Sequence, residues 1–432
     1  MNDFLQYKEA EFKINEGLIR MDISSARPEG YVKNPNSRME TMRQFLAACG
    51  DPQKSIPAIH VTGTSGKGSV CAAIAGILQS WGLKVGLHIS PYLQSATEKI
   101  WIDGQYISGK EFGKLVDWIM PLALPYRNPE TPASIHGMAS VAIALEAFRR
   151  DRVDVMVFEA GCGGRFDLTS FIDTEVAVIT NVGLDHTVSL GPNIEDIAWH
   201  KAGIIRKGIQ VVTGTTGVAL DVIKREAEML NAPVEIIPNT DGPRKHNFHL
   251  AKKAANAFGR RHQIPITDKI SMDGIHSVKL PGRFEKIADK ATVFLDGAHN
   301  ADKLTAAVNH VLDDESSQNG PRIAVVGILG TKADAATLAP LSAKFDQIIV
   351  TEPNVYGKKA FPASQTAVFL SDETPEPIIC PNPHEAVDLA LNLAIGGTVL
   401  ICGSFYLCGD VRSRWFSKEE VVCQRTSWPA PT

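Results

Sequence analysis

Short apolar runs rich in valine and isoleucine alternate along the chain with longer stretches of helical periodicity. In the first half of the sequence these runs occupy residues 56–63, 84–90, 153–161, 175–183 and 209–214. Several are apolar at nearly every position, which is typical of strands buried on both faces of a sheet. Helices are expected between them, for example over Ser69–Trp81 and Gly137–Arg150. The alternation predicts βαβ units with helices on both faces of a mostly parallel sheet.

A second series of apolar runs follows a break in this pattern. The break consists of a turn-rich segment at residues 238–242, a helical pattern over 246–262, and residues 271–283, which contain glycine and proline and are expected to form a connector. Residues 313–321 are expected to form a polar loop within the second series. The strands of that series are expected at residues 291–299, 322–329, 347–353, 376–381 and 397–405.

These patterns predict an α/β fold with two domains. The larger domain covers residues 1–278 and has a mostly parallel sheet, and the smaller one is a Rossmann-like α/β domain over residues 279–432. The chain has 432 residues, of which 44% are hydrophobic and 21% charged. This composition suits a well-cored globular protein and excludes a disordered chain or a small disulfide scaffold.

Charge, apolar runs and cysteines bear on partners and location. The formal net charge of −4 provides no basic surface for nucleic acid or an anionic membrane. No apolar run reaches the roughly 18–20 residues of a membrane helix, and the N-terminus does not resemble a signal peptide. The seven cysteines include no C-x-x-C pair and are expected to be reduced thiols. We therefore expect a cytoplasmic protein with neither a nucleic-acid nor a membrane partner.

The strongest local signal is the sequence HVTGTSGKGSV at residues 60–70. An apolar run leads into a glycine-rich turn and then a helical pattern, an arrangement whose backbone N–H groups surround phosphate oxygens. Lys67 would neutralise the β- and γ-phosphates, and Ser69 would reach a phosphate or its magnesium ion. The alternative is a glycine-rich turn that binds no ligand. The candidate phosphate-binding residues are Gly63, Thr64, Ser65, Gly66, Lys67, Gly68 and Ser69.

This loop is a variant, and further motifs follow it in a fixed order. The usual P-loop would place glycine at 61 and serine or threonine at 68, where this chain has Val61 and Gly68. The later motifs are SPYL (90–93), EKI (98–100), EAGCGGRFD (159–167), GLDHT (183–187), KAGII (201–205), PGR (281–283), DGAHN (296–300), TEP (351–353) and GSFYL (403–407). Loop and motifs together resemble the folylpolyglutamate synthase/dihydrofolate synthase family of the Mur ligase superfamily.

The resemblance implies a site for ATP and two magnesium ions. The family places metal ligands at positions matching Ser90, Glu159 and His186, with Ser69 of the loop as a further ligand. Glu159 ends an apolar run, where a carboxylate would face the phosphate loop. The lysine matching Lys201 is commonly carbamylated and helps to hold the second ion. The alternatives are a structural histidine at 186 and, for Lys201, a surface lysine at a helix C-terminus.

The resemblance also implies contacts to the rest of the nucleotide. Asn247, in a family pattern N-x-x-L-A, would contact ATP. Arg283 would reach a phosphate, for which a guanidinium fork is well suited. Asp296 would contact the ribose or the same nucleotide, and His299 lies near it in sequence. The alternative for Arg283 is a salt bridge in a linker.

Departures from the family pattern gather on the side of the acid substrate. The pterin-side motif T-x-F-E-x-x-T corresponds here to residues 131–137, which lack its aromatic residue and glutamate. The histidine after Ser-Pro is Tyr92, and the asparagine that usually follows G-G-R-x-D-A-T is Ser170. Loss of a stacking aromatic weakens recognition by about 1–3 kcal/mol. The ATP and metal positions are retained, so the chemistry is better supported than the acid.

We interpret the sequence as an ATP-dependent, ADP-forming ligase that joins a carboxylic acid to an amine through an acyl phosphate. Lys67, Lys201 and His186 are the catalytic candidates. The first choice is addition of L-glutamate to dihydropteroate or a folate by a monomeric enzyme, as the resemblance implies. A diverged ligase for another acid and amine is a second choice. A P-loop kinase or regulatory NTPase, or a binding protein, would leave the motifs of the smaller domain without a role.

Overall fold

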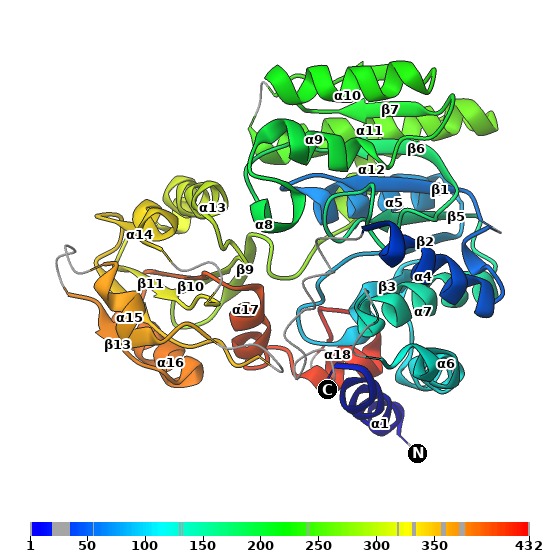
Figure 1. The fold of residues 1–432 in the computed structure, drawn as a ribbon. Helices are drawn as coiled ribbons and strands as arrows, with labels where there is room; N and C mark the ends of the chain where they lie inside the picture. Colours follow the sequence, from blue (N-terminus) through cyan, green and yellow to red (C-terminus); the bar gives the residue numbers. More distant parts are fainter. Residues whose placement is uncertain are drawn as a thin grey trace. The chain divides into compact units, whose positions relative to one another are not determined.

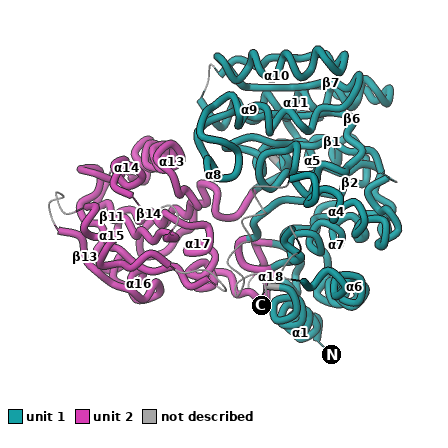
Figure 2. Tube along the Cα trace, viewed as in Figure 1, with its two compact units in different colours: residues 1–92, 96–279, 422–426 teal, residues 93–95, 280–421, 427–432 magenta. Residues whose placement is uncertain are grey.

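The computed structural model divides the chain into two compact units. It describes residues 2–19, 35–54, 56–128, 131, 133–239, 242–317, 319–330, 334–355, 360–370 and 376–430. Figure 2 shows the units: unit 1 comprises residues 1–92, 96–279 and 422–426, and unit 2 comprises residues 93–95, 280–421 and 427–432. The predicted limits 1–278 and 279–432 assumed a single passage of the chain between domains. In the structure the chain passes between the units more than once, because residues 93–95 belong to unit 2 and residues 422–426 belong to unit 1.

Unit 1 is built on a mostly parallel sheet, which confirms the predicted fold class. Its described residues form eight strands in the order β4-β3-β2-β5-β1-β6-β7-β8 (Figure 1). The β2–β3 and β3–β4 pairings are antiparallel, and the other pairings are parallel. The strands are β1 (Ala58–Thr62), β2 (Val85–His88), β3 (Ile100–Ile102), β4 (Gln105–Tyr106), β5 (Val155–Glu159), β6 (Thr174–Ile179), β7 (Gln210–Thr213) and β8 (Val234–Ile236).

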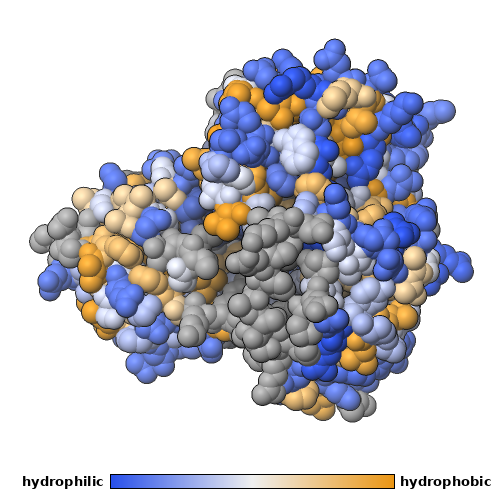
Figure 3. Space-filling view, viewed as in Figure 1, coloured by the Kyte–Doolittle hydropathy of each residue, from blue (hydrophilic) through white to orange (hydrophobic). Residues whose placement is uncertain are grey.

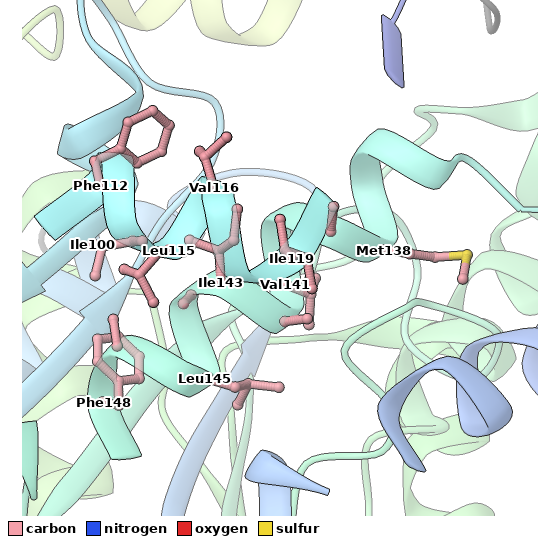
Figure 4. Close-up of a cluster of buried hydrophobic side chains, with 14 of the residues drawn as sticks. Ile100, Phe112, Leu115, Val116, Ile119, Met138, Val141, Ile143, Leu145 and Phe148 are labelled. Atoms are coloured by element: carbon pink, nitrogen blue, oxygen red, sulfur yellow. The ribbon is translucent and has the colours of Figure 1, made fainter. Parts of the chain in front are cut away.

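Helices cover both faces of this sheet (Figure 1). The α-helices are α1 (Asp3–Ile14), α4 (Pro35–Ala48), α5 (Lys67–Trp81), α6 (Gly109–Ala123), α7 (Ile135–Asp151), α8 (Thr187–Leu190), α9 (Ile194–Ala202), α10 (Gly217–Met229), α11 (Pro243–His262) and α12 (Asp268–Ser277). A π-helix covers Asn15–Ile19, and short 3₁₀ turns cover Pro52–Lys54, Ala96–Lys99 and Leu124–Tyr126. Figure 4 shows how side chains of α6 and α7 gather with Ile100 of β3 into one buried cluster.

The predicted connector at residues 271–283 is wrong over its first part, because α12 extends to Ser277. Its glycine permits close helix packing rather than a turn. A Cβ on Gly274 would lie 2.4 Å from the Ile77 Cα atom, and one on Gly76 would lie 2.3 Å from the Gly274 carbonyl oxygen. The Thr267 hydroxyl caps the helix by accepting a hydrogen bond from the Ile270 N–H. Glycine here lets α5 and α12 pack backbone to backbone.

Unit 2 has a second parallel sheet, as predicted, with one antiparallel edge strand. Its described residues form six strands in the order β13-β12-β11-β14-β10-β9, and β9 runs antiparallel to β10. The strands are β9 (Glu285–Ala288), β10 (Thr292–Leu295), β11 (Arg322–Val326), β12 (Gln347–Val350), β13 (Ile378–Ile379) and β14 (Thr398–Cys402). The pattern of apolar runs missed β9, in which buried and exposed positions alternate.

Helices pack on both faces of this sheet as well, around two apolar clusters. They are α13 (Ala301–Asp313), α14 (Ala335–Leu338), α15 (Ala363–Val368), α16 (Pro383–Leu393) and α17 (Phe405–Arg412), with 3₁₀ turns at Glu315–Ser317 and Ala339–Leu341. Helix α18 (Lys418–Gln424) includes the last passage of the chain from unit 2 to unit 1. The predicted polar loop at 313–321 thus contains a short 3₁₀ turn, and Gln318 lies outside the described residues.

The visible surface of each unit is largely hydrophilic, with hydrophobic residues in small groups (Figure 3). Among the described residues, none of the helices combines the length and apolarity needed to cross a bilayer.

Candidate active site

The glycine-rich loop joins β1 to α5 at the carboxyl end of the unit 1 sheet. Gly63 has a φ of 155°, and a Cβ there would lie 1.8 Å from the Thr180 hydroxyl oxygen. Gly66, with a φ of 79°, occupies the N-cap of α5. The Val70 N–H is bonded to the Gly66 carbonyl, so the amides of residues 67–69 precede the first helical hydrogen bond. N–H groups placed in this way, with the helix dipole behind them, suit an anion.

Asn181, which the sequence analysis did not select, holds the first half of this loop. Its side-chain oxygen accepts hydrogen bonds from the Thr64 N–H at 3.1 Å and from the Ser65 N–H at 2.9 Å. The Thr180 hydroxyl donates to the Ser65 carbonyl at 2.6 Å, and Thr64 and Gly183 exchange two further hydrogen bonds. Two loop amides therefore bind Asn181. The available signal was the polar Thr-Asn pair that closes an apolar run next to GLDHT.

Lys67 and Glu159 bring opposite charges to the loop. The Lys67 ammonium lies 4.0 Å from a Glu159 carboxylate oxygen and donates to the Gly63 carbonyl at 3.2 Å. Glu159 ends β5, as predicted, and is 5% exposed. Its other carboxylate oxygen accepts from the Ser90 N–H at 2.9 Å. The structure thus joins three of the predicted residues, and it provides oxygen donors of the kind that magnesium prefers.

Lys201 is buried at 3% exposure in the last turn of α9, so the alternative of a surface lysine is wrong. The end of α9 packs on the glycine-rich segment 161–165: the Arg165 N–H donates to the His200 carbonyl at 2.7 Å. A Cβ on Gly164 would lie 2.9 Å from the Lys201 carbonyl oxygen. This close approach explains the glycine pair that follows Cys162.

His186 sits in a more open place than the other predicted metal ligands. It caps α8 with a φ of 53°, its side chain is 51% exposed, and its Nε2 lies 4.0 Å from the Asp185 carboxylate. Within the described residues, no three His, Cys, Asp or Glu side chains form a metal-binding group. A metal ion at this site would therefore need serine, phosphate or water oxygens beside Glu159. The candidate serines are Ser69, in the glycine-rich loop, and Ser90, whose N–H contacts Glu159.

Asn247 lies against the phosphate loop from α11. A Cβ on Gly66 would lie 2.6 Å from the Asn247 side-chain oxygen, so the glycine leaves room for the amide. The two segments are far apart in sequence, and α5 and α11 pack against each other. Asn247 thus lies beside the glycine-rich loop, and its predicted contact with ATP stays a prediction.

In unit 2, Arg283, Asp296 and His299 lie in neighbouring segments. Asp296 follows β10, is 6% exposed, and accepts from the Phe284 and Ala298 N–H groups at 2.9 and 2.8 Å. Burial raises the pKa of the Asp296 carboxyl, and the nearby Arg283 partly offsets this effect. The Arg283 guanidinium lies 4.6 Å from the centre of the Phe405 ring and forms no ion pair among the described residues. The linker salt bridge is therefore not observed.

His299 is oriented by its own loop. Its Nδ1 lies 2.8 Å from the Gly297 carbonyl oxygen and its Nε2 lies 3.2 Å from the Lys303 ammonium. Since a carbonyl only accepts and an ammonium only donates, Nδ1 carries the proton and Nε2 accepts. The two contacts fix the orientation of the imidazole ring.

A pocket in unit 1 is lined by two of the departures from the family pattern, Tyr92 and His136. Tyr92, Lys99, His136 and Ser140 contribute its polar lining, together with Glu11 and Asn15; the apolar lining comes from Ile14, Ala96, Ile100, Phe112 and Ile143. The Lys99 ammonium donates to the Ser140 hydroxyl at 3.1 Å and lies 5.3 Å from the centre of the Tyr92 ring.

The positive charge of this pocket comes from Lys99 rather than His136. Burial lowers the pKa of Lys99 to about 8. Burial, together with the neighbouring Lys99 charge, lowers the pKa of His136 to about 3, so this imidazole is neutral near pH 7. Lys99 forms no ion pair among the described residues. Because Glu11 also lines the pocket, the Lys99 ammonium is matched by a carboxylate, and the pocket suits a ligand with hydrogen-bond acceptors for Lys99.

Comparison with known proteins agrees with the motif order. Residues 61–285 match the Mur ligase middle domain, and residues 282–405 match the Mur ligase glutamate ligase domain. The dihydrofolate synthase/folylpolyglutamate synthase of Bacillus subtilis is 31% identical over 423 residues, which cover 86% of this chain and 94% of that protein. The chain belongs to the folylpolyglutamate synthase/dihydrofolate synthase family. The folylpolyglutamate synthase of Lacticaseibacillus casei is also 31% identical, over 403 residues covering 85% of this chain and 92% of the relative.

Solved structures of this family have the same fold. Mycobacterium tuberculosis folylpolyglutamate synthase, complexed with ADP and AMPPCP, has a TM-score of 0.79 and 27% identity, covering 88% of this chain and 95% of the other. Escherichia coli FolC in complex with DHPP and ADP has a TM-score of 0.75 and 26% identity, covering 89% and 96%. The two-domain α/β architecture predicted from the resemblance is thereby confirmed.

The loop that contains Ser170, at the position of the usual asparagine, is held by contacts of its own. The Ser170 backbone carbonyl accepts a hydrogen bond from the Arg206 guanidinium, a contact that does not depend on the side chain at this position. In the same loop, Asp167 accepts hydrogen bonds from the Cys162 N–H at 2.8 Å and from the Thr169 hydroxyl at 2.5 Å. These contacts fix the loop after β5 from within. Of the segment 131–137, Pro132 lies outside the described residues, and Ser134 caps α7 by accepting from the Gly137 N–H.

Proposed function

We propose that this protein is an ATP-dependent, ADP-forming ligase that adds L-glutamate to a folate-type acid, dihydropteroate or a reduced folate, in the cytoplasm. The observation that carries the proposal is the match to family members over most of both units, combined with Lys67 and Glu159 at the glycine-rich loop. Relatives of solved structure are complexed with ADP, AMPPCP and DHPP. These complexes support a nucleotide and a pterin-type acid as ligands.

The phosphate loop supports the nucleotide part of the proposal. The amides of residues 67–69 in the loop 63–69 would bind the phosphates together with Lys67, and Asn247 lies beside Gly66. Glu159, Ser69 and Ser90 fit magnesium through their oxygens, with His186 and a carbamylated Lys201 as the further ligands that the family pattern suggests. Magnesium bound there would neutralise charge on the phosphate oxygens. The burial of Lys201 keeps its amine away from bulk water, as a stable carbamate requires.

The Lys99 pocket supports the choice of a folate-type acid. A pteridine ring is flat and carries carbonyl and ring-nitrogen acceptors. Lys99 and Ser140 supply hydrogen-bond donors for such acceptors, while Tyr92 and Phe112 supply aromatic surface. We infer that the pocket receives the ring end of the acid.

The proposed reaction has two steps. A carboxylate oxygen of the acid attacks the γ-phosphorus of ATP, the bond to the bridging oxygen breaks, and ADP leaves. Lys67 stabilises the charge on the transferred phosphoryl group. The glutamate amine then attacks the acyl carbon, the carbon–oxygen bond to phosphate breaks, and the amine loses a proton. Arg283, on unit 2, would hold a nucleotide phosphate as a bidentate donor.

The deciding experiment measures ADP release by the purified protein with magnesium and ATP, followed by mass spectrometry of the products. The reactions contain glutamate with dihydropteroate, glutamate with tetrahydrofolate, and each component alone. We expect ADP release that needs both acid and glutamate, and a product heavier by one glutamyl unit. ADP release with the acid but without an amine requirement would indicate a kinase or NTPase. If neither dihydropteroate nor tetrahydrofolate supports ADP release, the proposed substrate is contradicted.

A further inference from the structure

The most completely buried cation of the described residues is Arg412, at the end of α17 in unit 2. It is 0% exposed, and its guanidinium donates to both carboxylate oxygens of Glu285 at 2.7–3.0 Å. It also donates to the Gln94 side-chain oxygen at 2.5 Å and to the Ser427 carbonyl at 2.6 Å. The ring of Phe416 lies 4.4 Å from the guanidinium carbon. One side chain thus binds three segments that are far apart in sequence.

These three segments are the places where the chain passes between the units. Gln94 is the middle residue of 93–95, the short segment of unit 2 that directly follows Ser90-Pro91-Tyr92. Glu285 lies five residues after the passage from Lys279 to Leu280, and Ser427 is the first residue of the last segment of unit 2. Segment 93–95 also fits tightly on α17, because a Cβ on Gly409 would lie 1.9 Å from the Leu93 carbonyl oxygen.

The same network fixes the turn that carries Arg283. A carboxylate oxygen of Glu285 accepts from the Gly282 N–H at 2.9 Å, and the Arg283 guanidinium stacks on Phe405. Phe405 and Arg412 are the first and last residues of α17. Residues 282–285 are therefore attached to this helix at both of its ends, and a Cβ on Gly282 would lie 3.2 Å from the Phe405 ring.

We propose that Arg412 is a positioning residue, which holds Arg283 for the nucleotide through Glu285 and anchors the segment after Ser90 through Gln94. The inference rests on the proposed function, because it assumes that Arg283 binds a phosphate of ATP. Arg412 itself does not touch the substrates. A guanidinium suits this task because its planar fork serves Glu285, Gln94 and Ser427 at once, whereas a lysine ammonium cannot reach all three in plane.

The competing explanation is that Arg412 only stabilises unit 2. A buried ion pair adds little net stability over an apolar replacement, because desolvation of both charges offsets their attraction. A purely structural role would lower the melting temperature and leave nucleotide affinity unchanged in the folded fraction. A positioning role would weaken ATP binding, and that loss would depend on Arg283.

The test is a double-mutant cycle on the full chain with Arg412→Lys, Arg283→Ala and the combined variant. The readouts are the Kd for AMPPCP by calorimetry, KM for ATP, kcat and the melting temperature. Arg412→Lys is expected to raise the Kd and KM roughly tenfold, the scale of lost hydrogen bonds to a charged group, with a smaller change in kcat. The double variant is expected to bind no more weakly than Arg283→Ala, since both changes remove the same contact.

Two further variants separate positioning from stability. Gln94→Met removes one hydrogen bond to Arg412 and serves as the test if Arg412→Lys does not fold; a several-fold rise in Kd is expected. Leu391→Ala, on α16, lowers stability by leaving a cavity in the apolar cluster but removes no hydrogen bond of Arg412, and it should leave Kd unchanged.

The outcomes separate this inference from the proposed function. Suppose that Arg283→Ala weakens binding. If Arg412→Lys then has no effect on Kd, or if its effect adds in full to that of Arg283→Ala, Arg412 does not act through Arg283 and the positioning role is wrong. If Arg283→Ala binds AMPPCP as the wild type does, the nucleotide contact of Arg283 and the inference built on it both fail. Equal effects of Leu391→Ala and Gln94→Met on Kd would also overturn the positioning role.

Discussion

Lys67 and Lys99 of unit 1 and Arg412 of unit 2 use positive charge in opposite ways. In unit 1, Lys67 and Lys99 face the phosphate loop and a pocket, and the nearest carboxylate oxygen to Lys67 is 4.0 Å away. In unit 2, Arg412 is fully buried and its guanidinium is bonded to a carboxylate, an amide and a carbonyl. A charged group that is already paired within the protein interacts less strongly with a ligand than an unpaired one does. The difference supports the proposal that the loop and pocket of unit 1 bind ligands and that the Arg412 network is a scaffold.

The largest effect is expected from breaking the buried pair. Arg412→Met leaves the Glu285 carboxylate buried without its cation, which costs about 3–5 kcal/mol in the free energy of unfolding. Combining it with Glu285→Gln should restore part of this loss, because the uncompensated charge is then gone. Denaturation followed by circular dichroism checks both variants. An unchanged transition in Arg412→Met would contradict the assignment of this network as a scaffold.

Removal of Lys67 should act on catalysis and leave the fold intact. We expect Lys67→Ala to lower kcat roughly 10²–10³-fold, because a positioned charge on the transferred phosphoryl group is lost. ADP release in the coupled reaction measures the effect, and the melting temperature should change little. Activity close to that of the wild type would argue against phosphoryl transfer at this loop.

Lys99 should control the affinity for the acid and its pH dependence. Burial lowers the pKa of Lys99 to about 8, so the amine is protonated below that pH and loses its charge as the pH rises through it. The KM for the acid should therefore rise above pH 8 in the wild type. Lys99→Met should raise it roughly tenfold at neutral pH, the scale of a lost charge-assisted hydrogen bond.

Lys99→Arg is the matched control for this prediction, because arginine stays charged throughout the range and should remove the rise near pH 8. A wild-type KM that is flat across pH 8 would rule out a role for the Lys99 charge in binding the acid.

The smallest effect is expected from a cation of unit 1 that faces water. Lys84 forms an ion pair with Asp151, and its side chain is 39% exposed. Lys84→Ala should change stability by less than about 1 kcal/mol and leave KM and kcat unchanged, because solvent screens such pairs. A rise in KM as large as that caused by Lys99→Met would show that the effect of Lys99 comes from the net charge of the protein and not from the position of this lysine.

Much of the fold was predictable because strands buried on both faces must be apolar along their length. Strands β1, β5 and β14 are buried at every position and lie within the predicted runs, and β6 begins one residue before its run. The short edge strands do not satisfy this condition. β4 has two residues, and β8 and β9 have exposed positions, so neither length nor apolarity marks them. Helix α12 was missed for another reason: its glycine serves packing on α5.

The sequence by itself determined the order of the motifs, the strand that carries Glu159 and the loop that carries Lys67. These features depend on local patterning and on residue chemistry at strand ends. Tertiary structure alone decided that Asn181 holds the loop, that Lys201 is buried, and that Lys99 shares a pocket with His136. It also decided that Arg412 joins residues more than 300 positions apart, as its bond to Gln94 shows. Such contacts depend on how distant segments pack, and one sequence carries no local signal for the partner of a buried charge.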